Sequence, residues 1–62
     1  LETFYFNEGQ DRERRAEYDI AVENYTYAVY NERLKSVSSS PVTVEANKRI
    51  NEILARYRFE TN

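Results

Sequence analysis

Cysteine, histidine, methionine and tryptophan are absent from this 62-residue chain, and glycine and proline occur once each. Without Cys or His, the chain has no disulfide framework and cannot build the usual zinc, thiolate or Ser-His-Asp sites. With a single glycine, it cannot form a glycine-rich phosphate loop. These absences disfavour most enzyme classes, and we expect a non-enzymatic protein with no metal and no cofactor.

Long apolar runs are missing as well. The longest, 4–6 and 27–30, are far shorter than the ~18 residues that a membrane span needs, and no signal peptide opens the chain. We therefore expect a soluble protein with no membrane contact, and among compartments the cytoplasm is slightly favoured. Because the first residue is Leu1 and not Met, we expect a piece or a processed product of a longer chain.

Because glycine and proline, the residues that most often interrupt helices, occur only once each, the sequence predicts long helices. Asn7, three residues before Gln10, has the spacing of a capping box, and Ser40 followed by Pro41 is typical of a helix start. The sequence predicts one small all-α domain (1–62) made of an aromatic arm (1–7), a first helix (8–36), a loop (37–40) and a second helix (41–59). A domain this small buries only about 60% of its extended-chain surface, so we expect it to need support beyond one core.

Apolar residues form one stripe on the second predicted helix and two on the first. The second helix carries Ala46, Ile50, Ile53 and Tyr57 at intervals of four, three and four. On the first helix, one stripe consists of Tyr18, Val22, Tyr25 and Val29, flanked by Ala21 and Ala28. Nearly opposite lie Ala16, Ile20, Tyr27, Tyr30, Leu34 and Val37, in a heptad seam of coiled-coil type that Glu23 interrupts.

A two-helix hairpin can cover only one of the two stripes. Antiparallel pairing sets Ala46, Ile50, Ile53 and Tyr57 opposite Val29, Tyr25, Val22 and Tyr18. The second stripe then needs another molecule, and we expect the hairpin to dimerise into a four-helix bundle. The expected interface consists of Ile20, Glu23, Tyr27, Tyr30, Leu34 and Val37, and its partner is a second copy or another helical protein.

Tyrosine is the compositional outlier, with six in 62 residues. Tyrosines are enriched at interfaces, where one end of the ring is buried and the hydroxyl is wet. We interpret Tyr18 and Tyr25 as core residues, and Tyr27 and Tyr30 as either core or interface residues. Glu23 could bind a metal together with Asp19, but an alternative is favoured: it meets an Arg or a Tyr hydroxyl across the interface and fixes the register.

Arg12, Arg14 and Arg15 form the densest basic cluster. Three interpretations compete: a solvated helix end, a phosphate contact and a dibasic processing site. The leading functional hypothesis is a protein-protein interaction or assembly module that acts through the tyrosine-rich helix face. The alternative is a small dimeric nucleic-acid-binding regulator that uses these arginines or the basic face of the second helix. The net charge of −2 disfavours nucleic acid as the partner.

Overall fold

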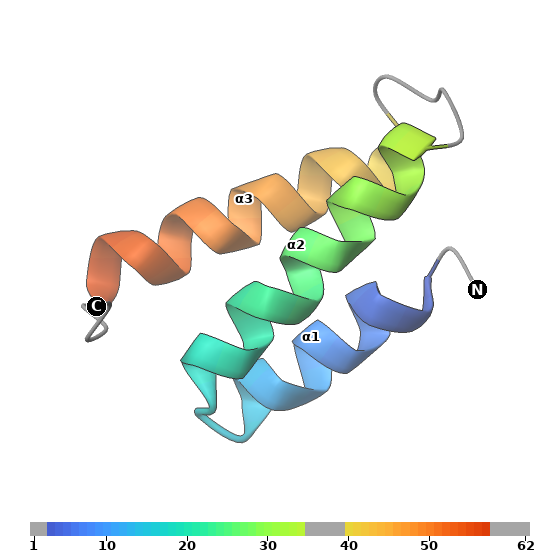
Figure 1. The fold of residues 1–62 in the computed structure, drawn as a ribbon. Coiled ribbons are helices and arrows are strands. Elements are labelled where there is room, and N and C mark those ends of the chain that lie inside the picture. The colour runs from blue at the N-terminus through green and yellow to red at the C-terminus, as the bar shows by residue number, and fades with distance from the viewer. Residues whose placement is uncertain (1–2, 35–39, 58–62) are drawn as a thin grey trace.

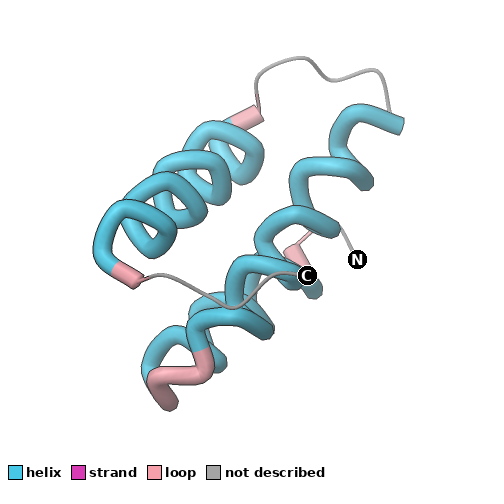
Figure 2. The backbone as a smooth tube through the Cα atoms, turned by 60° about the vertical axis from the view of Figure 1, so that its left-hand side comes forward, coloured by secondary structure: helices cyan, strands magenta, loops and turns pink. Residues whose placement is uncertain are grey.

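The computed structural model describes residues 3–34 and 40–57, which form three helices. They are α1 (Phe4–Arg14), α2 (Tyr18–Leu34) and α3 (Pro41–Arg56). Helix α2 is central and packs against both of the others (Figure 1). Figure 2 shows α3 standing to one side of α2, with the short loop between α1 and α2 at the bottom. The all-α prediction is confirmed for the described residues, but three helices replace the expected two-helix hairpin.

Helix α3 begins where the sequence predicts it. The Ser40 side chain accepts a hydrogen bond from the backbone N–H of Thr43 (3.1 Å), and Pro41 occupies the first helical turn, where its missing N–H costs nothing. Ala46 and Ile53 of the predicted stripe are buried, and Ile50 packs against them. The helix ends at Arg56, because Tyr57 has an extended backbone (φ −123°, ψ 137°), so the predicted end at 59 is wrong.

The predicted continuous helix over 8–36 is wrong, because the chain reverses direction between α1 and α2. Ala16 has a left-handed backbone with φ of 63°. The N–H of Glu17 bonds to the carbonyl of Arg12 (2.9 Å), and the N–H of Ala16 bonds to that of Glu13 (3.0 Å). This is the hydrogen-bond pattern of a Schellman motif, which ends a helix by satisfying its last carbonyls.

The predicted aromatic arm over 1–7 is also wrong from Phe4 onward, because those residues begin α1. Helix α1 folds back along α2, with its single glycine against the ring of Tyr25. A Cβ placed on Gly9 would lie 2.8 Å from ring atoms of Tyr25, so only glycine leaves room for that ring. The charged residues 8–14 therefore form part of a helix that covers α2.

The core follows the first predicted stripe of α2. The buried apolar residues are Ala21, Tyr25, Ala28, Val29, Ala46 and Ile53. At one end of the core, the rings of Tyr18 and Tyr57 stack with centroids 4.0 Å apart and planes 13° apart, so this predicted pair is in contact. Helix α2 thus buries one face between α1 and α3 and leaves another uncovered.

Candidate functional site

The uncovered side of α2 carries the second predicted stripe. Tyr27 is 54% exposed, Tyr30 58% and Ile20 38%. Glu23 is also exposed on this helix. We call these four residues the tyrosine face. Leu34 ends α2, but its side chain lies outside the described part of the chain, as does Val37.

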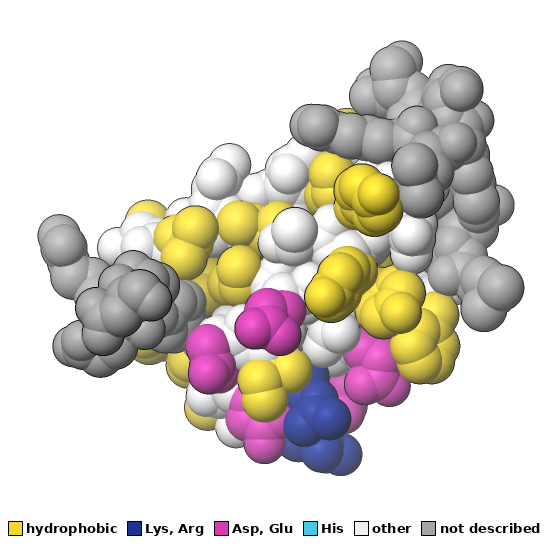
Figure 3. Space-filling view, viewed as in Figure 1, with side chains coloured by type: hydrophobic (Ala, Val, Ile, Leu, Met, Phe, Trp, Pro, Cys, Tyr) yellow, Lys and Arg dark blue, Asp and Glu magenta, His cyan; other side chains and the backbone are white. Residues whose placement is uncertain are grey.

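Helix α1 adds aromatic rings beside the tyrosine face. The ring of Tyr5 lies 5.3 Å from that of Tyr27, and the ring of Phe4 lies 5.2 Å from that of Tyr5. Phe4 is 51% exposed. Figure 3 shows apolar side chains gathered where α2 and the start of α1 face the viewer. The sequence interpretation missed this neighbourhood because it placed both rings in an arm outside any helix; only the density of aromatic residues over 4–6 could have pointed to it.

Two acidic residues lie on or beside the tyrosine face, Glu23 within it and Asp19 one turn earlier on α2. Asp19 is exposed, and its Oδ1 atom accepts a hydrogen bond from the backbone N–H of Ile20 (2.8 Å). Glu23 is one turn further along α2. Within the described ranges, no group of three or more Asp and Glu side chains could hold a metal ion. Polar seam residues instead favour one register of helix contact over others.

The structure places the arginine cluster among carboxylates. Arg12 donates to Glu17 (2.6 Å), and this hydrogen bond raises the pKa of the guanidinium. Arg14 and Arg15 both pair with Asp11, at 3.6 and 3.3 Å. Two carboxylates, Asp11 and Glu17, thus pair with the three arginines and offset two of their three positive charges, which weakens the attraction of the cluster for phosphate.

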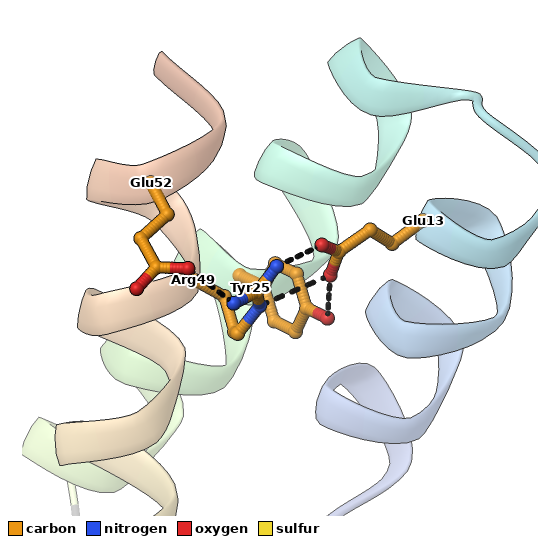
Figure 4. Close-up of polar contacts among 4 residues, drawn as sticks. All are labelled: Glu13, Tyr25, Arg49 and Glu52. Carbon is orange, nitrogen blue, oxygen red and sulfur yellow. Dashed lines mark hydrogen bonds and ion pairs between the residues drawn. The ribbon is translucent and has the colours of Figure 1, made fainter. Parts of the chain in front are cut away.

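A second group of residues, which we call the polar junction, ties the three helices together (Figure 4). It consists of Glu13, Tyr25, Arg49 and Glu52. The Tyr25 hydroxyl donates to Glu13 Oε1 (2.8 Å), and Arg49 Nε donates to the same oxygen (3.2 Å). Arg49 also forms an ion pair with the second Glu13 oxygen and donates to Glu52 (2.6 Å). One carboxylate of α1 thus binds side chains of both α2 and α3.

The surroundings of Glu13 and Tyr25 in the polar junction shift the pKa values of both groups. The hydrogen bond from Arg49 holds the pKa of Glu13 below its ordinary value, against the opposing effect of burial. Burial, and then the hydrogen bond to Glu13, raise the pKa of Tyr25. Glu13 is therefore ionised and Tyr25 protonated at neutral pH, and the two groups act as a fixed acceptor and donor.

A cleft of about 250 Å³ opens beside the polar junction, and its walls include Tyr18, Arg56 and Tyr57. A second opening on the junction, walled by Gln10 and Arg14, measures about 340 Å³ and so reaches only the lower end of the ~300–1,000 Å³ that is usual for small-molecule sites. The junction's own donors and acceptors are already bound to one another. These observations support a structural role for the polar junction. The sequence interpretation missed the junction because nothing in a sequence connects Glu13 with Arg49.

No helix in the described part of the chain is both long enough and apolar enough to cross a membrane. Comparison of the sequence and the structure with protein-family models, curated proteins and solved structures finds no match. The functional argument therefore depends on the chain's own surfaces.

Proposed function

We propose that this protein is a non-enzymatic assembly module that binds a helical partner, in the first place a second copy of itself, through the tyrosine face of α2. The observation that carries the proposal is the exposure of Tyr27 and Tyr30, at 54% and 58%, in the middle of the central helix. Large aromatic rings with polar tips are the residues that protein interfaces favour. Contiguous apolar surface of this kind is typical of binding sites.

The surroundings of the tyrosine face support the same function. Phe4 and Tyr5 extend its apolar surface onto α1, so that a partner would contact two helices. Because each chain contributes three described helices, the proposed dimer contains at least six helices, with the two α2 helices at its centre. This assembly takes the place of the four-helix bundle expected from the sequence.

Sedimentation equilibrium over a wide concentration range tests the proposal. We expect the average mass of the wild-type protein to rise toward that of a dimer as the concentration increases. The double variant Tyr27→Ser, Tyr30→Ser should remain a monomer. The melting temperature of the wild-type protein should also rise with concentration, because association stabilises the folded chain by mass action.

A matched control comes from α3, where Val44 and Leu54 are 58% and 49% exposed. The double variant Val44→Ser, Leu54→Ser removes similar exposed apolar surface at another place and should dimerise like the wild type. A wild-type protein that stays monomeric at every concentration, or a tyrosine variant that still dimerises, would contradict the proposal.

A further inference from the structure

The exposed positions of the tyrosine face have a symmetric spacing along α2. Ile20, Glu23, Tyr27 and Tyr30 follow one another at intervals of three, four and three residues. This order of intervals is the same in both chain directions. If two copies of α2 lie antiparallel about a two-fold axis between Glu23 and Tyr27, Ile20 of each copy faces Tyr30 of the other. Glu23 of each copy then faces Tyr27 of the other, as a self-complementary interface requires.

The chemistry of these pairs favours that register. An exposed carboxylate would accept a hydrogen bond from a tyrosine hydroxyl, and an isoleucine would cover a tyrosine ring. The same chain already contains such a pair, since Glu13 of α1 accepts from the hydroxyl of Tyr25 on α2 at 2.8 Å. Hydrogen bonds to an ionised acceptor are stronger than neutral ones.

The parallel register lacks this complementarity. It would set Glu23 against Glu23 of the second copy, and juxtaposed like charges across an interface are repulsive. We propose that the partner of the tyrosine face is a second copy in the antiparallel register, which pairs Glu23 with Tyr27 and Ile20 with Tyr30. This inference rests on the proposed function. Glu23 is then the residue that selects the direction of the partner helix.

The size of the face predicts how tightly the copies bind. A fully buried aromatic side chain covers roughly 150–250 Å², and Tyr27 and Tyr30 each have about half of their surface to contribute. With Ile20 and Phe4, each copy would bury about 400 Å², against the ~800 Å² per partner of a standard interface. The dimer is therefore expected to be weak and to exchange rapidly.

Cysteine cross-linking distinguishes the two registers, because the native chain contains no cysteine. Ile20→Cys and Tyr30→Cys are made in separate chains, mixed in equal amounts and oxidised in a thiol-disulfide buffer, and the products are weighed by mass spectrometry. In the antiparallel register the mixed disulfide should make up nearly all of the cross-linked product, against the half that random pairing would give. A Val44→Cys chain on α3 gives the rate of cross-linking by random collision.

The effect of Glu23→Ala on the dimer constant, measured by sedimentation, is a second test that needs no disulfide. Glu23 is exposed, so the monomer should keep its helical circular dichroism. The antiparallel register predicts a severalfold weaker dimer, and the parallel one a tighter dimer because a repulsion is removed. A wild-type dimer with mainly Ile20→Cys self-cross-links, or a tighter Glu23→Ala dimer, would overturn the register alone. A wild-type protein that is always monomeric would overturn the proposed function as well.

Discussion

Helices α1 and α3 both pack against α2, but different forces hold them there. Helix α3 contributes buried apolar side chains, Ala46 and Ile53, to the core. The single buried residue of α1 is Gly9. What joins α1 to the rest is the close approach of Gly9 to Tyr25, the aromatic contacts of its first turn, and the carboxylate of Glu13 in the polar junction.

This difference has consequences for stability. Burial of apolar surface depends little on pH and is lost only when the core opens. A contact that depends on one ionised carboxylate is weakened when that group is protonated. We therefore expect α3 and α2 to form the stable unit of the molecule and α1 to detach first. The following variants test that comparison, beginning with the largest expected effect.

Truncation of the core on the α3 side should destabilise the whole molecule. Ile53 is 2% exposed, and Ile53→Ala should lower the free energy of unfolding by about 2–5 kcal/mol, since it removes buried methyl groups and leaves a cavity. For so small a domain, this should unfold most of the chain at room temperature. Circular dichroism with urea titration measures the effect.

The neighbouring residue provides the control. Leu54 is 49% exposed, so Leu54→Ala removes a similar side chain without opening a cavity and should change stability by less than about 1 kcal/mol. Equal losses in the two variants would show that α3 does not pack in the register described.

Removal of the negative charge of Glu13 should lower the free energy of unfolding by less than Ile53→Ala does, and the loss should be concentrated on α1. In Glu13→Gln, the ion pair with Arg49 is lost, and we expect about 1–2 kcal/mol less stability at neutral pH. Hydrogen exchange should show faster exchange in α1 and little change in α3. Glu52→Gln is the control, because Glu52 also binds Arg49 but is more exposed than Glu13 and lies on the same helix as Arg49.

The pH dependence follows from the direction of the Glu13 pKa shift. Because the folded-state pKa lies below the unfolded value of about 4.3, Glu13 contributes its full stabilisation above that value. The contribution is lost as the pH falls through the lower, folded-state pKa. The difference in stability between the wild type and Glu13→Gln should therefore shrink below about pH 4. A difference that stays constant down to pH 2 would show that the carboxylate charge is not what binds α1.

The two sides of α2 also differ in how well the sequence predicts them. The start of α3, its apolar stripe and the contact between Tyr18 and Tyr57 follow from capping and periodicity. The exposure of Tyr27 and Tyr30 agrees with their place on the second stripe. The separate helix α1 could not be predicted, because its end is marked by neither Gly nor Pro. Its contacts come from aromatic rings of its first turn, a glycine and a carboxylate, which together have no apolar helical period.

The end of α1 could not be predicted because the residue that ends it is an alanine, Ala16. Substitution of Ala16 is the test with the smallest expected effect. Alanine favours helix interiors, yet here its φ is 63°, a conformation that costs L-residues about 1–2 kcal/mol. Ala16→Gly relieves this strain but adds freedom to the unfolded chain, so we expect a gain of about 0.5–1 kcal/mol. Ala55→Gly, at an exposed helical position of α3, should instead lose about 0.5–1 kcal/mol in the same urea titration. If both glycine variants lost stability, residue 16 would have to be helical, and α1 and α2 would form the single helix that the sequence alone predicts.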